Sequence, residues 1–383
     1  MKISPIVFLA LLVSCTKNID LPSEVSQQAE DKKPESCNFG IQAFNKTKRA
    51  ASPETINQKK KARGNVTTPL PAATIYLDFD GQVVSNTIWN HNGTINAAPA
   101  NLRLAEIDKI MQRVTEDFSP FNVVVTDDEE VFNATNPYKR MRVIITESWE
   151  WFGVVGGTAF NHSFLWGNNT PSFIFSTLLG YNEKYIAEAI SHEVGHTLGL
   201  VHQAEYDASC RFVSEFNLGF GEGPTSWAPI MGIGYYKNVT TWHKGPTVAG
   251  CNVIQDDVAV LSGILGLKPD DNAEMNKFES FTTSTLNLIN SSADIDYYFV
   301  DAKQTTSIIA QPVSLPNEEG ANLNLRLLIY DKHGALLGIA SNPALLSAST
   351  TLPPDKYYIG VETEAAIGQT RHGMLGRYTL RSE

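Results

Sequence analysis

The sequence predicts an α+β protein in which a mixed α/β region precedes an all-β region. Strand-like and helix-like patterns alternate over residues 71–270, whereas short β-type segments separated by turns occupy residues 275–383. A length of 383 residues allows two domains with separate hydrophobic cores. Residues 1–14 have the pattern of a signal peptide, and residues 15–70 have that of a polar tether or propeptide. We therefore expect two folded domains behind an export signal.

The N-terminus indicates export from the cytoplasm. An apolar run over residues 3–13 is too short to span a membrane as a helix and suits the core of a signal peptide. It ends in Leu-Val-Ser-Cys, which resembles a bacterial lipobox and implies cleavage before Cys15 and lipid attachment to its thiol. An ordinary secretory signal with an incidental cysteine is the alternative. Because Thr16 follows in place of aspartate, the expected location is the outer membrane or cell surface, with the lipid on Cys15 as the membrane contact.

The mixed region begins with an alternation of strands and one long helix. Residues 102–118 carry Leu104, Ile107, Met111 and Val114 at helical spacing. Short runs rich in β-branched and aromatic residues predict strands. These runs cover residues 74–79, 122–126, 142–146 and 172–176.

The most informative segment runs from His192 to His202 and reads His-Glu-Val-Gly-His-Thr-Leu-Gly-Leu-Val-His. On a helix that turns about 100° per residue, His192 and His196 lie on one face, so both imidazoles can bind one metal ion. Glu193 points to an adjacent face, from which it can contact a metal-bound water as a general base. Gly199 lets the chain leave the helix, so that His202 can return as the third ligand. Three neutral histidines leave a fourth position for water, which is typical of one catalytic Zn²⁺.

This pattern resembles the zinc-binding motif of the metzincin clan of zinc metallopeptidases. About thirty residues downstream, the tetrapeptide Pro-Ile-Met-Gly around Met231 resembles the Met-turn of the same clan. The resemblance implies a catalytic domain with a twisted mixed sheet, an active-site helix and a Met-turn, with Met231 packed beneath the histidines. It also implies hydrolysis of peptide bonds with Glu193 as the catalytic base. Gln203 follows the third histidine and matches none of the usual family markers, so we assign no subfamily.

Two tyrosines are candidates for stabilising the oxyanion. In several metzincin families a tyrosine two residues after the methionine contacts the metal or the developing negative charge. Ile233 occupies that position here, and Tyr235 and Tyr236 come later in the chain. Either tyrosine could donate a hydrogen bond to an oxyanion if the loop brought it to the metal.

Residues 15–70 hold few large apolar side chains and cannot bury enough surface to fold alone. A flexible tether is the simplest interpretation. As an inhibitory propeptide, the segment could close the zinc site with Cys37 and be cut at the basic run of residues 59–63. The sequence around Cys37 does not match the cysteine-switch segment of matrix metallopeptidases.

The resemblance also suggests how substrate binds. Residues 156–160 would lie on or beside the sheet edge along which an extended substrate pairs in this clan. An ordinary bulged loop is the alternative for this glycine-rich segment.

The part of the chain around Met231 has two further features. Cys210 and Cys251 bracket it and are candidates for a disulfide in an exported protein. Residues 256–266 look like the closing helix of the catalytic domain, with Asp256 and Asp257 in its first turn as capping groups.

The last hundred residues predict a compact β-sandwich. The segments that begin at Asp294, Leu325 and Tyr357 resemble the pre-peptidase C-terminal domain found in secreted bacterial peptidases. Asp294 and Asp296 could bind Ca²⁺, but solvated turn carboxylates are the simpler interpretation, so calcium is unsupported. The predicted strands are residues 297–300, 307–311, 325–331, 356–363 and 378–381.

The net charge of −11 argues against a nucleic-acid partner.

The leading interpretation is a zinc-dependent endopeptidase that hydrolyses extracellular or periplasmic proteins or peptides. One alternative is a surface-anchored binding protein or adhesin with a structural metal site, against which the intact Glu193 argues. Another is a zinc hydrolase of non-peptide amides. The sequence leaves the physiological substrate and the oligomeric state open.

Overall fold

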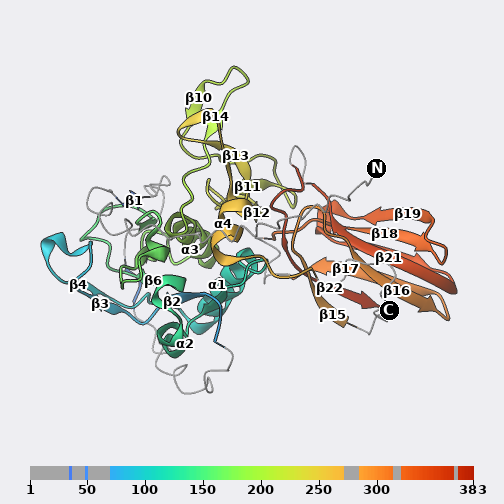
Figure 1. Cartoon of the computed structure of the whole chain (residues 1–383), viewed down its shortest axis with the longest axis horizontal. Helices are drawn as coiled ribbons and strands as arrows, with labels where there is room; N and C mark the ends of the chain where they lie inside the picture. Colours follow the sequence, from blue (N-terminus) through green and yellow to red (C-terminus); the bar gives the residue numbers. More distant parts are fainter. Residues whose placement is uncertain (1–33, 37–47, 51–69, 271–283, 314–320, 366–369) are drawn as a thin grey trace, which may run out of the picture. The chain divides into compact units, whose positions relative to one another are not determined.

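The computed structural model describes residues 34–36, 48–50, 70–270, 284–313, 321–365 and 370–383. The predicted signal peptide, Cys15, Cys37 and the basic run of residues 59–63 lie outside these ranges. The described chain comprises a mixed α/β region and a C-terminal antiparallel β-sandwich, in agreement with the α+β prediction (Figure 1). None of the helices within the described ranges combines the length and the apolar character that crossing a membrane requires.

A six-stranded sheet organises the α/β region, with the strand order β1-β7-β8-β6-β2-β5. β8, β6, β2 and β5 run parallel to one another, whereas β7 is antiparallel to β8 and β1 is antiparallel to β7. The predicted strands are all present, with small shifts at their ends. Their bounds are β1 Glu35–Ser36, β2 Thr74–Asp78, β5 Val124–Thr126, β6 Arg140–Thr146, β7 Gly157–Ala159 and β8 Ser172–Phe175.

Both faces of this sheet are covered, which explains why its central strands are almost continuously apolar. On one face Ile145 and Ile174 belong to the core shared with the helices. On the other face Ile144 and Phe173 pack in a second cluster around Trp89, whose ring meets Phe173 edge-on at 5.6 Å between centroids. Residues at odd and even positions of one strand therefore serve two different cores.

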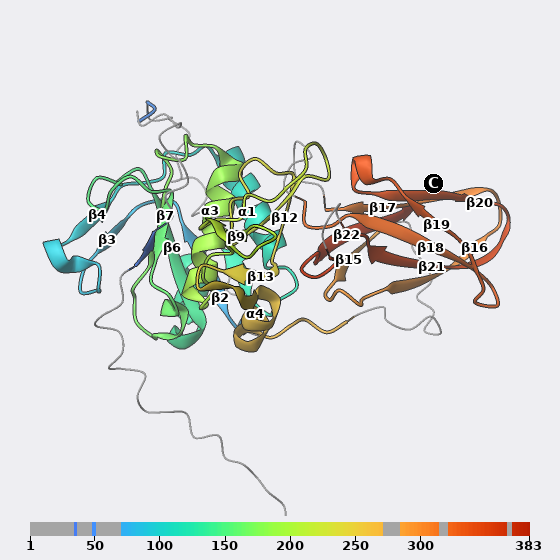
Figure 2. The same ribbon diagram turned by 90° about the horizontal axis from the view of Figure 1, so that it is seen from above.

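The strongest helical prediction, over residues 102–118, is confirmed by α1, Leu104–Asp117. Ile107 and Val114 are buried because they recur on one helical face. α1 lies beside α3, Glu183–Thr197, which also contacts β6, β7 and β8 (Figure 2). The sheet and α1 thus hold α3 from two sides. Two further helices are α2 (Glu129–Ala134) and α4 (Asp257–Leu265).

A disulfide joins two hairpins in the part of the chain that follows α3. Cys210 and Cys251 form the predicted bridge, with their Cα atoms 5.7 Å apart. The two cysteines are 41 positions apart in the sequence and Met231 lies between them, so the bridge closes a large loop and restricts the unfolded chain. The strands of this part are β9 Glu205–Tyr206, β10 Phe212–Ser214, β11 Trp227–Pro229, β12 Val239–Thr241, β13 Lys244–Thr247 and β14 Gly250–Asp256.

The C-terminal region is a sandwich of two four-stranded antiparallel sheets. In β16 alternate residues are buried, as expected when one face of each sheet meets the core. All five predicted segments coincide with strands, and β15, β19 and β20 were not predicted. One sheet contains β15 Ser284–Ile289, β22 Gly376–Ser382, β17 Thr306–Pro312 and β20 Ala348–Leu352, and the other contains β16 Asp296–Ala302, β21 Asp355–Thr363, β18 Leu325–Asp331 and β19 Leu336–Ser341.

The expectation that Asp294 and Asp296 are solvated turn carboxylates is wrong. Both side chains are buried. Their carboxylates have partners there: Asp296 accepts a hydrogen bond from the buried Tyr378 hydroxyl, and Asp294 accepts one from the main-chain amide of Asn290. Oxygens of these carboxylates and of Asp270 lie within 4.8 Å of one another. Calcium was only the alternative interpretation of these carboxylates, and it stays untested.

Smaller elements complete the described fold. They are β3 Gln82–Val84 and β4 Ile95–Ala97, which form a two-stranded sheet, and the 3-10 helices η3 Asn90–Asn92, η4 Pro137–Lys139, η5 Ser163–Leu165 and η6 Pro343–Leu345.

Candidate metal centre

The second half of α3 carries the first two histidines of the motif. Ile186, Ile190 and Val194 are fully buried along the predicted apolar stripe, and they fix the rotation of the helix about its axis. This rotation places His192 and His196 one above the other, and both imidazoles are also buried. The rigid helix therefore sets the spacing of these two rings without help from a metal ion.

The exit from α3 returns His202 to the same place. Gly199 has a φ of 99°, a conformation that side chains other than glycine rarely adopt. A Cβ atom at this position would also lie 2.6 Å from Nε2 of His162. The next residue, Leu200, folds back so that its amide donates to the carbonyl of Gly195 at 3.0 Å. Glycine is thus required by both the turn and the close approach, and the turn directs His202 towards the first two histidines.

The three imidazoles converge through their Nε2 atoms. Nε2 of His196 lies 3.1 Å from Nε2 of His192 and 3.1 Å from Nε2 of His202. Ligands of a tetrahedral zinc ion with Zn–N bonds of about 2.0–2.1 Å are about 3.3 Å apart. The separations therefore fit a metal ion bound by all three rings.

The opposite ring nitrogens settle the direction of the lone pairs. Nδ1 of His192 lies 2.7 Å from the carbonyl oxygen of Ile230, and Nδ1 of His196 lies 2.9 Å from that of Leu200. Carbonyl oxygens only accept, so both Nδ1 atoms are donors and both Nε2 atoms carry lone pairs. Two buried acceptors at 3.1 Å repel each other unless they share a cation. The donor set therefore fits a metal ion such as zinc.

Burial also favours the protonation state that ligation needs. It lowers the pKa of all three histidines, because a buried imidazolium loses its hydration. The pKa of His196 falls to about 4, and that of His202 falls to about 2 with a further contribution from the neighbouring His196. Neutral imidazole is the form that binds metal ions, so the site is ready for metal at neutral pH.

The predicted methionine lies directly against the helix that carries the first two histidines. Met231 is fully buried, and a Cβ atom at Gly195 would lie 2.5 Å from its Sδ atom. The same turn contacts both ends of the histidine motif. The carbonyl of Ile230 accepts from His192, and the carbonyl of Met231 accepts from the amide of Gln203 at 2.9 Å. Met231 therefore packs against the turn of α3 between His192 and His196.

The side chain of Glu193, a residue of α3, points from the helix towards the sheet. Its side chain is fully buried, and a Cβ atom at Gly157 of β7 would lie 2.7 Å from its Cγ and 2.8 Å from its Oε1. The carboxylate thus contacts the strand that we expected to bind substrate. Glycine at position 157 is what leaves room for the glutamate.

Asp257 has a different role from the one predicted. Asp256 caps α4 as expected, by accepting from the amide of Ala259. The buried carboxylate of Asp257 instead accepts from Nε2 of Gln203 at 3.0 Å and from Nε2 of Gln255 at 2.9 Å. It therefore fixes the residue that directly follows the third histidine.

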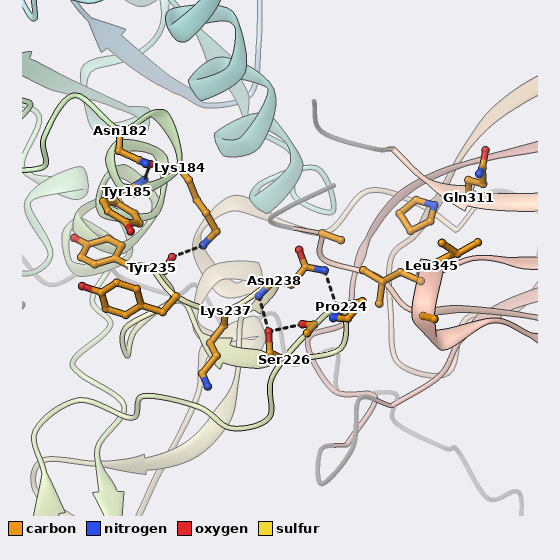
Figure 3. A pocket seen from close by; sticks show the side chains of 16 residues that line it. Asn182, Lys184, Tyr185, Pro224, Ser226, Tyr235, Lys237, Asn238, Gln311 and Leu345 are labelled. Atoms are coloured by element: carbon orange, nitrogen blue, oxygen red, sulfur yellow. Dashed lines mark hydrogen bonds between the residues drawn. The ribbon is translucent and has the colours of Figure 1, made fainter. Parts of the chain in front are cut away.

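The structure does not bring Tyr235 and Tyr236 to the histidines. Nζ of Lys184 donates to the carbonyls of Gly234 and Tyr235 at 2.7 and 3.1 Å, which holds this segment at the start of α3. Lys184 lies about two turns before His192, or about 12 Å along the helix. The two tyrosines line a separate cavity of about 880 Å³ whose lining residues do not include the histidines (Figure 3). Their predicted contact with an oxyanion finds no support in this arrangement.

Two residues that the sequence analysis did not single out contact the third histidine. Nδ1 of His202 lies 2.8 Å from Oε1 of Glu215, and the ring of Phe216 lies 4.4 Å from that of His202 between centroids. Both belong to the irregular segment after the motif, where no periodicity or spacing indicated a role.

Part of the expected tether is bound to the α/β region. β1 pairs with β7, with Glu35 opposite Ala159 and Ser36 opposite Thr158. Further along the chain, the side chain of Arg49 binds Asn101 and Glu106 of the same region. The predicted edge strand β7 is therefore followed by one more strand in the sheet, and residues 15–70 are not all free of the folded region.

The side chain of Arg49 is held by several groups. Its guanidinium donates to both carboxylate oxygens of Glu106 at 2.7 and 3.1 Å and to the carbonyl of Asn101, and it lies over the ring of Tyr181. Burial alone would raise the pKa of Glu106, but hydrogen bonds from Arg49 and Arg103 outweigh burial and lower it to about 2. At neutral pH this carboxylate is ionised and anchors Arg49.

Comparisons with known proteins identify no family. No protein-family model and no curated protein sequence matches the chain. One similar solved structure is the pre-peptidase C-terminal domain of a collagenase from Bacillus anthracis, with 14% identity over 30% of this chain and 98% of that chain and a TM-score of 0.21. Another is PliG of Aeromonas hydrophila, a periplasmic inhibitor of g-type lysozyme, with 15% identity over 28% of this chain and 92% of that chain and a TM-score of 0.20. Similarity at this level assigns no activity.

Proposed function

We propose that the protein is a zinc-dependent endopeptidase. The observation that carries this proposal is the convergence of three neutral imidazoles through Nε2 atoms 3.1 Å apart, with a buried glutamate next to the first of them. A bound zinc ion would supply Lewis acidity, which lowers the pKa of water and polarises a peptide carbonyl. Glu193 would accept the proton of the attacking water and deliver it to the leaving nitrogen. A purely structural metal site would not need this base.

The substrate in this proposal is an extended polypeptide. β7 lies directly against Glu193, so a chain paired with β7 would pass the catalytic base. Main-chain hydrogen bonds to a strand give affinity with little demand on side chains, which suits an enzyme that accepts unfolded proteins.

The proposed location is outside the cytoplasm. The Cys210–Cys251 disulfide supports an oxidising compartment. We retain the lipid on Cys15 as the proposed membrane contact and the outer membrane or cell surface as the proposed site. Exported proteins and peptides would then be the partners, rather than nucleic acid.

The test is metal-dependent cleavage of an unfolded protein. Denatured casein is incubated with the full chain carrying one zinc per molecule, with the chelated chain and with the chelated chain after zinc is restored. We expect new N-termini in the first and third samples and none in the second. Zinc binding without cleavage, in wild type and in an Arg49→Ala variant that loosens the N-terminal segment, would favour a binding protein or a hydrolase of non-peptide amides.

The bound N-terminal segment should slow this reaction, because β1 occupies the outer edge of β7. Arg49→Ala removes the anchor of that segment and leaves Glu106 paired with Arg103. Loss of charge-assisted hydrogen bonds worth about 1.5 kcal/mol should raise kcat/KM about tenfold. Lys48→Ala is the matched control, since Lys48 makes an exposed ion pair with Glu150. Equal rates for wild type and both variants would show that β1 does not restrict access.

A further inference from the structure

The third histidine differs from the first two in the group that accepts a hydrogen bond from its Nδ1 atom. His192 and His196 donate from Nδ1 to main-chain carbonyls, whereas His202 donates to the carboxylate of Glu215 at 2.8 Å. We propose that Glu215 is a positioning residue for the third metal ligand. The proposal rests on the endopeptidase function above and adds a residue that the sequence motif does not contain.

The position of His202 explains why a side chain is needed here. The first two histidines are fixed by α3, but His202 lies beyond Gly199 on a loop, where no helix sets the angle of the ring. A hydrogen bond to Nδ1 fixes both the tautomer and the orientation of the imidazole, so that Nε2 faces the other two rings. Glu215 thus does for His202 what main-chain carbonyls do for the others.

A carboxylate also changes the strength of the ligand. Its negative charge polarises the Nδ1–H bond and makes Nε2 a better electron donor to a metal ion. The side chain of Glu215 is 54% exposed, whereas His202 is 3% exposed. The site therefore gains a charged acceptor without the cost of burying it fully.

The hairpin that follows the motif holds Glu215 in place. β9 begins three residues after His202, and β10 ends at Ser214, directly before Glu215. Pairing of Glu205 with Ser214 brings the two ends of the hairpin together, so its register determines how closely Glu215 approaches His202. The next residue, Phe216, packs its ring against His202 from the same chain segment.

The Cys210–Cys251 disulfide attaches this hairpin to its neighbour. Cys210 lies between β9 and β10, and Cys251 lies in β14 of the adjacent hairpin. A second contact runs from the hydroxyl of Tyr206 to the carbonyl of Thr247 at 2.8 Å. At the base, the amide of Ala204 donates to the carbonyl of Pro246 at 2.9 Å. The hairpin that carries Glu215 is therefore fixed at its tip and at its base, which a positioning role requires.

The experiment measures zinc affinity, which does not depend on turnover. Zinc is titrated against a chelating dye in wild type, Glu215→Ala, Glu215→Gln and Glu222→Ala. Loss of an outer hydrogen bond to a ligating histidine typically weakens metal binding by about 10–100-fold, and we expect this for Glu215→Ala. Glu215→Gln keeps an acceptor and loses the charge, so it should fall between Glu215→Ala and wild type. Glu222 is exposed in the same chain segment, and its variant should bind zinc like wild type.

Two further readouts separate positioning from a general structural role. Cobalt(II) placed in the site should show a shifted absorption spectrum in Glu215→Ala, because the third ligand changes its orientation. The melting temperature of the metal-free protein should change little, since Glu215 is partly exposed. Unchanged zinc affinity with an unchanged cobalt spectrum would overturn the proposal, and so would a loss of affinity fully matched by melting of the metal-free chain. If wild type binds zinc but cleaves no peptide, the endopeptidase proposal fails while the affinity series still decides the role of Glu215.

Discussion

Glu193→Gln is expected to lower kcat on a peptide substrate by about 10³-fold, the middle of the range for loss of a general base. Glutamine has the size of glutamate, so packing against Gly157 and the fully buried position are retained. The amide cannot accept a proton at neutral pH, and the attacking water keeps both of its protons. Since the base acts on the transition state, kcat and kcat/KM should fall together while KM stays nearly constant.

The measurement requires proof that the site is otherwise intact. Zinc content should remain at one ion per chain in Glu193→Gln, because the proposed ligands are the three histidines. Glu183→Gln is the matched control, since Glu183 lies in the same helix and pairs with Lys109 at 2.6 Å. This variant should retain kcat within about twofold, because a partly exposed ion pair contributes little and Glu183 lies more than two helical turns from the histidines. An active Glu193→Gln enzyme at full zinc occupancy would remove Glu193 from the mechanism.

The sequence was most informative where a regular period governs burial. α1 and the five predicted sandwich strands were found because one face of each meets a core. β19 was missed because its side chains are mostly exposed, so they show no alternation of buried and polar residues. β1 was missed because a strand of two residues has no pattern at all. Its pairing depends on β7, which is more than a hundred residues away in the sequence.

The same distinction applies to the metal centre. The histidine motif and Glu193 could be predicted because one helix and the turn after it determine their positions. The spacing within eleven consecutive residues is therefore enough to predict the geometry. Glu215 could not be predicted, since its distance from His202 depends on the register of a hairpin. Tyr235 was expected near the metal, but Lys184 donates hydrogen bonds to the main-chain carbonyls of Gly234 and Tyr235. No sequence pattern indicates this contact.

Gly195→Val should have the second large effect, although it replaces a helical glycine. In most helices such a change is neutral or stabilising, because glycine costs about 1 kcal/mol relative to alanine. Here a Cβ atom would lie 2.5 Å from Sδ of Met231 and 3.3 Å from Cδ1 of Leu200. Met231 is fully buried, so its flexible side chain has no free volume to enter. We expect a loss of about 3 kcal/mol in the free energy of unfolding, the upper part of the range for overpacking.

The position of Gly195 makes the same substitution a test of the Met-turn. Gly195 lies between His192 and His196, so displacing Met231 should also shift the carbonyl of Ile230 that orients His192 and weaken zinc binding. Gly263→Val in α4 is the matched control, because no atom lies within 4 Å of its Cβ position, and urea unfolding should show little change. Met231→Ala removes the clashing atoms. The double variant Gly195→Val/Met231→Ala should therefore be at least 1 kcal/mol more stable than the sum of the single losses predicts. Additive losses would mean that Gly195 is required for a reason other than the close approach of Met231.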